Sequence, residues 1–295
     1  MRIFLTGATG FIGTAVTREL INAGHQVLGL TRSEQGAQTL AAMGAEVHFG
    51  NINDLDSLRR GAAQTDGVIH TAFNHDFSDF VANCARDGQI IEALGSVLEG
   101  SSRPLLITSG VALGAVEPNT PATEDYFNIL HPNPRKASEI GGMKAAERGV
   151  NVSVIRLSQV HDPIKQGLIT TLVELALQTG VSAYVDEGAN CWSAVHISDA
   201  ARLYVLALEK NALNSRYHAV AEPAIAMRTI AHTLGRVLNL PVKRIEAADA
   251  AAHFGWLAAF MGHDMSASSA LTQQRLGWKP TGPGLIADLE KMPVV

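Results

Sequence analysis

Short apolar runs, each bounded by turn residues, alternate with longer amphipathic stretches through the first half of the chain. Runs that are apolar at consecutive positions are typical of strands buried on both faces of a parallel sheet. The amphipathic stretches have the length of the helices that connect such strands. The pattern predicts strands at 2–6, 26–31, 46–49, 67–71, 104–109 and 152–157, and helices at 11–23, 35–43, 55–62, 77–98 and 135–148.

This alternation predicts an α/β fold with a doubly wound parallel sheet, a Rossmann domain, over residues 1–157. We interpret residues 158–295 as mainly a smaller, helix-rich substrate-binding lobe that partly interleaves with the sheet domain. In doubly wound sheets, ligands bind beyond the carboxyl ends of the strands, so the site is expected there. The helices predicted after residue 157 lie at 168–179, 199–208, 227–238 and 247–260, between loops rich in Gly, Pro and His.

Charge and composition narrow the class of partner. The formal net charge is −5 and no run of Lys or Arg exceeds two residues, which argues against a nucleic-acid or anionic-membrane binder. Cys84 and Cys191 stand in no CxxC or His/Cys pattern, so neither a metal site nor a disulfide framework is predicted. The chain shows no charged-then-apolar leader, and no apolar run reaches the roughly eighteen residues that span a bilayer. We therefore expect a cytoplasmic protein that acts on a small molecule, without nucleic acid or membrane, and a homodimer is left open.

The first strand runs directly into a glycine-rich turn, GATGFIG at residues 7–13, that opens a helix. Gly7 and Gly10 permit a tight turn whose N–H groups approach a pyrophosphate, while Gly13 lets helix and strand pack closely. The turn lies within a βαβ unit of about thirty residues, which is the context that dinucleotide binding requires. The cofactor-binding residues predicted from it are Gly7, Thr9, Gly10, Phe11, Ile12 and Gly13.

The residues after the second strand bear on the choice of cofactor. NAD enzymes usually carry an acid there that binds the ribose 2′-hydroxyl, whereas this chain has Arg32 and Ser33. A guanidinium pairs with a 2′-phosphate, which a carboxylate would repel. The sequence therefore favours NADP(H) over NAD(H), with Arg32 and Ser33 as cofactor-binding residues. The alternative is that Arg32 is a solvated surface charge for which Glu34 competes.

The segment TGATGFIG at residues 6–13 resembles the cofactor fingerprint of the extended and atypical short-chain dehydrogenases/reductases, the NAD-dependent epimerase/dehydratase-like group. Other segments match in order over essentially the whole chain: GNIND at 50–54, VIHTAF at 68–73, TSG at 108–110, IRL at 155–157, VHISD at 195–199 and LGWKP at 276–280. The resemblance implies that Asn51 and Ile52 border the adenine. It also implies that Thr71, Ala72 and Phe73 lie along the ribose and the nicotinamide.

The same resemblance points to catalytic residues and to one departure. Ser109 ends the fifth predicted strand, where the family places the serine that hydrogen-bonds the substrate oxygen and stabilises its developing charge. A helix-cap or loop hydroxyl is the alternative. The family's Tyr-x-x-x-Lys pair, which donates the proton and holds the ribose, is absent, because no tyrosine has a lysine four residues later. In the matching window, His131 falls near the Tyr position and Arg135 near the Lys position.

Each of these two positions has a competing interpretation. Arg135 is predicted to hold the nicotinamide ribose and to favour an alkoxide, with Lys136 as the competing candidate. His131 is predicted as a general acid, against the alternative of a solvated loop histidine. Tyr126 is kept as a displaced proton donor. The resemblance also implies positions at the substrate for three residues, each with a structural role as the alternative: His161, Trp192 and His196.

These residues favour an NADP(H)-dependent oxidoreductase of the short-chain dehydrogenase/reductase type, with the hydride carried by the cofactor. The expected reaction is carbonyl reduction, or the reverse alcohol oxidation, on a small organic substrate. One alternative is a nucleotide-sugar epimerase or dehydratase, against which the missing Tyr-x-x-x-Lys pair counts. The other is a non-catalytic NADP(H) sensor, which hydride turnover on a ketone would separate from an enzyme.

Overall fold

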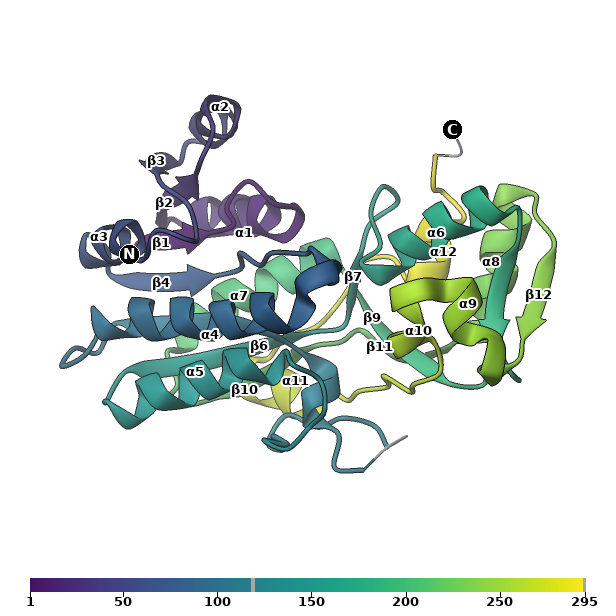
Figure 1. Cartoon of the computed structure of the whole chain (residues 1–295). Helices are drawn as coiled ribbons and strands as arrows, with labels where there is room; N and C mark the ends of the chain where they lie inside the picture. Colours follow the sequence, from purple (N-terminus) through teal and green to yellow (C-terminus); the bar gives the residue numbers. More distant parts are fainter. Residues whose placement is uncertain (118–119, 294–295) are drawn as a thin grey trace.

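The larger of the two lobes is built around a parallel sheet (Figure 1). The computed structural model describes residues 1–117 and 120–293, and within them seven strands pair in the order β10-β6-β5-β4-β1-β2-β3. The chain runs outward from β1 to β3 and then returns to β4 on the other side of β1, which creates the crevice where such folds bind ligands. The Rossmann fold predicted from the sequence is confirmed. The strands are β1 (Arg2–Thr6), β2 (Gln26–Thr31), β3 (Glu46–Phe49), β4 (Gly67–His70), β5 (Pro104–Gly110), β6 (Asn151–Leu157) and β10 (Arg216–Ala219).

The prediction of six strands for this sheet is wrong, because β10 adds a seventh at the edge beside β6. This strand has only four residues, and its polar residues Arg216 and His218 alternate with Tyr217 and Ala219. It therefore lacks the continuous apolar run from which the other strands were predicted. The backbone N–H of Val154 in β6 donates to the carbonyl of Ser215 at 2.8 Å, next to the start of β10. Pairing with β6 therefore supplies what the local sequence of β10 lacks.

Helices cover both faces of the sheet, because the side chains of each strand alternate between two apolar cores. Ile3 and Leu5 enter the core under α1, α2 and α7, whereas Phe4 enters the core under α3, α4 and α5. In Figure 1, α4 and α5 lie in front of the sheet and α7 lies behind it. Like β10, α7 follows residue 157, yet it packs against α1 in the sheet domain. These helices are α1 (Phe11–Asn22), α2 (Glu34–Ala42), α3 (Leu55–Ala63), α4 (Phe80–Ser96), α5 (Lys136–Glu147) and α7 (Ile197–Lys210).

The second lobe has an apolar core of its own and two small sheets, β11-β9-β7 and β12-β8. The helix predicted at 247–260 is instead broken into short turns, because Gly255 has a φ of +56° that ends the helix before it. None of the helices among the described residues has the length and hydropathy needed to cross a membrane. The remaining elements are β7 (Gln159–His161), α6 (Leu168–Thr179), β8 (Ser182–Val185), β9 (Cys191–His196), β11 (Glu222–Ala226), α8 (Met227–Leu238), β12 (Val242–Ile245), α9 (Ala250–Phe254), α10 (Ala258–Met261), α11 (Ala270–Leu276) and α12 (Leu285–Leu289).

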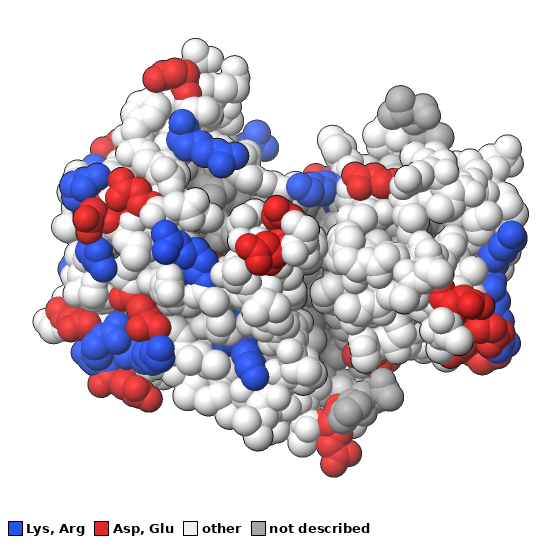
Figure 2. All heavy atoms as spheres, viewed as in Figure 1, with Lys and Arg blue, Asp and Glu red and all other residues white. Residues whose placement is uncertain are grey.

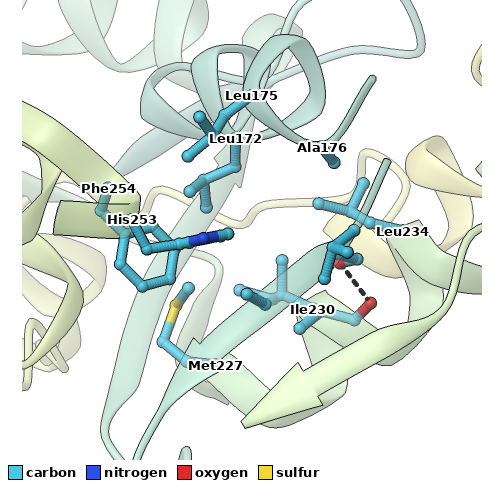
Figure 3. Close-up of a pocket in the computed structure, with 12 residues that line it drawn as sticks. Leu172, Leu175, Ala176, Met227, Ile230, Leu234, His253 and Phe254 are labelled. Atoms are coloured by element: carbon cyan, nitrogen blue, oxygen red, sulfur yellow. Dashed lines mark hydrogen bonds between the residues drawn. The ribbon is translucent and has the colours of Figure 1, made fainter. Parts of the chain in front are cut away.

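The core of this lobe encloses a small apolar cavity between α6 and α8 (Figure 3). Leu172, Ile230 and Leu234 point toward it, and the ring of His253 closes one side. Its volume is about 10 Å³, which is about the space of a single water. We therefore attribute it to packing rather than to ligand binding.

A buried polar cluster joins β10 to the rest of the sheet domain. Arg156 of β6 is fully buried and donates two hydrogen bonds to Glu139 of α5, at 2.7 and 2.9 Å. The Nε2 atom of His218 lies 3.3 Å from an Arg156 amino group, and its Nδ1 lies 2.8 Å from the carbonyl oxygen of Ser268. A neutral imidazole satisfies both contacts, with Nδ1–H donating and Nε2 accepting. Burial, together with the Arg156 charge, lowers the pKa of His218 to about 3.

Acid is expected to destabilise the protein partly through His218. Between pH 6.5 and pH 3 the unfolded chain binds a proton at this residue that the native protein does not bind. The free energy of unfolding should therefore fall with decreasing pH, by up to about 1.4 kcal/mol per pH unit from this group. Between pH 6 and pH 4, the free energy of unfolding measured with urea should fall less steeply with decreasing pH for His218→Asn than for the wild type. His232→Asn, which changes an exposed histidine of α8, is the control, and identical slopes for His218→Asn and wild type would contradict the prediction.

Candidate functional site

A deep cleft of about 1890 Å³ lies between the carboxyl ends of the sheet strands and the second lobe. Figure 2 shows it as the hollow that separates the two lobes. Residues after β1, β2, β4 and β5 form one wall, and α6 together with the α9–α10 segment contributes to the other. Ligand pockets for a single small molecule are about 300–1,000 Å³, so this cleft has room for a dinucleotide and a substrate together.

The glycine-rich turn lines the cleft, and its backbone is packed too closely to accept side chains at Gly7 and Gly13. Gly7 has a φ of +71°, and a Cβ atom there would lie 2.7 Å from the backbone nitrogen of Ala72. A Cβ atom on Gly13 would lie 1.9 Å from the carbonyl oxygen of Gly7, so the start of α1 rests directly on the turn. No side chain among the described residues caps α1, which begins after Gly10. Its first N–H groups thus remain available to an anion, and this arrangement fits the pyrophosphate of a dinucleotide. All six residues predicted from this turn line the cleft: Gly7, Thr9, Gly10, Phe11, Ile12 and Gly13.

The residues predicted to border the adenosine also line the cleft. Arg32 is exposed and forms no salt bridge with a carboxylate in the described part of the chain, Glu34 included. Ser33 caps α2, because its hydroxyl accepts a hydrogen bond from the Gly36 N–H at 3.1 Å. Asn51 uses its side-chain oxygen in its own turn, where the Asn53 N–H donates to it at 2.8 Å. Ile52 lies beside it in the cleft wall.

Ser109 lies at the carboxyl end of β5, where the strand opens into the cleft. The residue is 4% exposed, and its hydroxyl has no hydrogen-bond partner among the described residues. Buried hydroxyls in proteins are nearly always paired, so an unpaired one in a cleft wall needs an explanation. A substrate oxygen is a partner that fits this position.

Arg135 also lines the cleft, immediately before α5. Its guanidinium donates to Asp87 at 2.6 Å and to the carbonyl of Thr108, the neighbour of Ser109, at 3.1 Å. The same group lies 4.0 Å from the centre of the Phe73 ring, in a cation–π contact. A fixed cation therefore lies beside the end of β5, next to Thr71, Ala72 and Phe73 after β4.

Asp87 of α4 holds this arginine in place and was not predicted from the sequence. It is fully paired, because His70 lies 3.0 Å from its Oδ1 and the hydroxyl of Ser138 donates to its Oδ2 at 2.6 Å. Burial alone raises the pKa of Asp87, but the charge of Arg135 and the hydrogen bonds from His70 and Ser138 outweigh it and keep the pKa below its usual range. His70 in turn contacts the hydroxyl of Thr6 at 2.6 Å, so the network spans β1, β4, α4 and α5.

The candidate proton donors of the sequence are not part of the cleft wall. His131 lies in the loop before α5 and accepts a hydrogen bond from the Asn133 N–H at 3.1 Å. Burial, with the nearby charges of Lys136 and His263, lowers its pKa. Tyr126 and Lys136 are likewise outside the residues that line the cleft, whereas Arg135 is among them.

The three residues implied for the substrate lie in the interior of the second lobe or at a helix end. His161 is buried with its Nδ1 2.7 Å from Asp288 of α12. Trp192 is fully buried in the apolar core. His196 caps α7, where its Nδ1 accepts from the Ser198 N–H at 3.3 Å. None of the three lines the cleft, as far as the structure describes it.

Other cleft residues had no signal in the sequence. His75, after β4, lies in the cleft with Lys165 of the second lobe. Partial desolvation and the charges of Arg135 and Lys165 lower the pKa of His75. An isolated histidine or lysine in a loop carries no motif, and only the fold places these two opposite each other.

Comparisons with known proteins agree with this geometry. The model of the NAD dependent epimerase/dehydratase family matches residues 3–220. The chain is 47% identical over 291 residues to an uncharacterized protein of Schizosaccharomyces pombe, covering 98% of each chain. It is 25% identical over 279 residues to the 4-hydroxy-2-methyl-3-oxo-4-farnesyl-3,4-dihydroquinoline-1-oxide ketoreductase of Stigmatella aurantiaca, covering 86% of this chain and 80% of that one.

Among solved structures, the dTDP-glucose 4,6-dehydratase DesIV of Streptomyces venezuelae is similar in fold, with a TM-score of 0.77. It is 20% identical, and the match covers 99% of this chain and 96% of that one. The shared fold, the glycine turn at the end of β1 and the family match over most of the chain lead to one classification. The chain belongs to the NAD-dependent epimerase/dehydratase family, within the extended short-chain dehydrogenase/reductase group.

Proposed function

We propose that the protein is an NADP(H)-dependent oxidoreductase that reduces a carbonyl group, or oxidises the corresponding alcohol, on a small organic molecule. The observation that carries this proposal is the buried hydroxyl of Ser109 in the cleft wall, which has no hydrogen-bond partner in the part of the chain that the structure describes. The Stigmatella aurantiaca relative, whose name describes a ketoreductase, supports this class of reaction. A cytoplasmic location and a small-molecule partner are consistent with the net charge of −5.

Residues at different positions in the cleft would bind different parts of the cofactor and the substrate. The glycine turn and the start of α1 would hold the pyrophosphate, with Arg32 at the 2′-phosphate and Arg135 at the nicotinamide ribose. Bound NADPH supplies the hydride. Ser109 would donate a hydrogen bond to the substrate oxygen and stabilise the negative charge that develops on it.

Arg135 would contribute a second electrostatic effect. Its positive charge lies beside the end of β5 and favours an alkoxide there over a neutral carbonyl. Because His131 and Tyr126 lie outside the cleft wall, we propose that water in the open cleft supplies the proton to the alkoxide. A carbonyl substrate whose oxyanion is delocalised or internally hydrogen-bonded would need the least stabilisation from the enzyme.

Turnover decides between the candidate functions. Loss of the reduced-nicotinamide absorbance should follow addition of a ketone or quinone from a panel to enzyme and NADPH. UDP-glucose incubated with enzyme and NAD(P)⁺, and analysed for epimerised or dehydrated sugar, is the second arm. Sugar conversion without carbonyl reduction would replace this proposal with an epimerase or dehydratase. NADPH binding without turnover in either arm would favour a sensor.

Cofactor preference is expected to depend on Arg32. Replacing it with aspartate should raise the Kd for NADPH by about tenfold or more, because a charge-assisted contact of roughly 1.5–3 kcal/mol is lost and a repulsion is added. The Kd for NADH should change little. Calorimetric titration of both cofactors measures this, with Arg18→Asp, at an exposed arginine of α1 outside the cleft, as the control. Equal affinity of the wild type for NADPH and NADH would contradict the assignment.

A further inference from the structure

We propose that the cleft takes a flat, uncharged aromatic carbonyl compound, held by an aromatic cluster that bridges the two lobes; this rests on the oxidoreductase function proposed above. The cluster consists of Phe73, Phe77, Phe80, Trp256 and Phe260. All five line the cleft. The chain has nine Phe and three Trp residues in total, so five of these twelve side chains gather at one site. Such a concentration in a chain that is only 5% aromatic calls for a ligand-based explanation.

The five rings form a continuous series that starts at the catalytic end of the cleft. Phe73 lies under the guanidinium of Arg135, and its ring centre is 6.2 Å from that of Phe80 in an edge-to-face contact. Phe80 is 5.3 Å from Phe77. Phe77 stacks on Trp256 with the ring centres 4.0 Å apart and the planes at 9°. Trp256 meets Phe260 edge to face at 6.1 Å.

This series crosses from one lobe to the other. Phe73, Phe77 and Phe80 belong to the segment that follows β4 and to the start of α4, whereas Trp256 and Phe260 belong to the α9–α10 segment. The rings are not sealed from solvent, because Phe77 and Phe80 are half-buried and Trp256 is 40% exposed. Aromatic faces that line a cleft and are still reached by water gain free energy when a flat ring covers them.

The charges of the cleft disfavour a nucleotide sugar at this end. Arg135 is already paired with Asp87, and Arg86 donates to the carbonyl of Asn53, on the adenosine side. Lys165 also forms no salt bridge among the described residues, but its ammonium lies 5.8 Å from the centre of the Phe11 ring, in the glycine turn. The carboxylates of Asp76 and Glu174 line the same cleft. Among the described residues, neither Arg135 nor Arg86 is thus free to pair with a diphosphate beside the aromatic cluster, whereas a neutral ring meets five aromatic side chains.

Tryptophan fluorescence can test the cluster, because Trp192 and Trp278 are fully buried and Trp256 is the exposed tryptophan. With NADP⁺ present, 1-phenyl-1,2-propanedione should quench this fluorescence saturably. Its analogue 1-cyclohexyl-1,2-propanedione, which differs in the ring alone, should bind about tenfold more weakly. Trp256→Phe should lose the quenching but keep the affinity in calorimetry, since an aromatic ring remains. Trp256→Ala should bind the phenyl compound about tenfold more weakly, and NADP⁺ affinity should stay unchanged in both variants.

The control variant is Phe49→Ala, which removes an aromatic side chain that is 55% exposed and lies outside the cleft lining. It should bind both diones as the wild type does. The aromatic site would be overturned if the two diones bound with equal affinity to the wild type and to Trp256→Ala. The oxidoreductase function would still stand in that case if both diones were reduced. A preference for the phenyl compound, with no NADPH oxidation by any carbonyl compound of the panel, would support the aromatic site and overturn the oxidoreductase function.

Discussion

Ser109→Ala is expected to lower kcat for carbonyl reduction by about a hundredfold, with little change in NADPH affinity. Ser109 is 4% exposed and lines the cleft, and its hydroxyl is unpaired among the described residues, so no hydrogen bond is lost on its removal. The loss falls on the stabilisation of negative charge on the substrate oxygen, which develops in the transition state. Both kcat and kcat/KM should therefore fall together. Steady-state kinetics with a substrate from the carbonyl panel, beside calorimetric titration of NADPH, measures both quantities.

Ser158→Ala provides a matched control for this experiment. Ser158 also lines the cleft, but its hydroxyl already donates to the carbonyl of Ala219 at 2.6 Å. Its loss should change kcat by less than about threefold, since that hydroxyl is not free for a substrate. His131→Ala should cost less than about tenfold if water supplies the proton. Full activity of Ser109→Ala together with an inactive His131→Ala would invert the two roles.

Asp87→Ala is expected to reduce the free energy of unfolding by about 3 kcal/mol or more. The substitution leaves the Arg135 guanidinium, with a side chain 14% exposed, without its carboxylate. It also removes the acceptor for the hydroxyl of Ser138 and the partner of His70. Removing one member of a buried pair costs more than the pair itself contributes, because the other charge stays desolvated. Urea unfolding at pH 7 measures the effect.

The same helix pair offers a surface ion pair for comparison. Glu92 of α4 and Lys144 of α5 lie 2.9 Å apart, with side chains that are 34% and 52% exposed. Glu92→Ala should cost at most about 1 kcal/mol, since water screens an exposed pair. A loss for Asp87→Ala no larger than that for Glu92→Ala would show that Asp87 contributes as little to stability as a surface carboxylate does.

Local sequence was sufficient for the features that depend on a few consecutive residues. The strands β1 to β6 were predicted because each is an apolar run between turn residues, and a strand buried on both faces needs such a run. The glycine turn at 7–13 was recognisable because its close backbone contacts exclude side chains at fixed spacings. The position of Ser109 followed from the end of a predicted strand, although its catalytic role remains a proposal.

Tertiary structure decided the features that join distant segments. β10 is too short and too polar to be recognised alone, and pairing with β6 makes it a strand. Asp87 offered a partial signal, because it occupies an apolar-face position of α4 between Cys84 and Ile91, yet its partner Arg135 is 48 residues away.

The aromatic cluster depends most completely on the fold. Trp256 and Phe77 come from different lobes, and only the packing of the lobes stacks their rings. The sequence by itself therefore determined the fold class and the cofactor turn, which short patterns encode through local backbone geometry. The charge network around Arg135 and the walls of the substrate end were decided by tertiary structure, because ion pairing and ring stacking act through space between side chains that no sequence spacing relates.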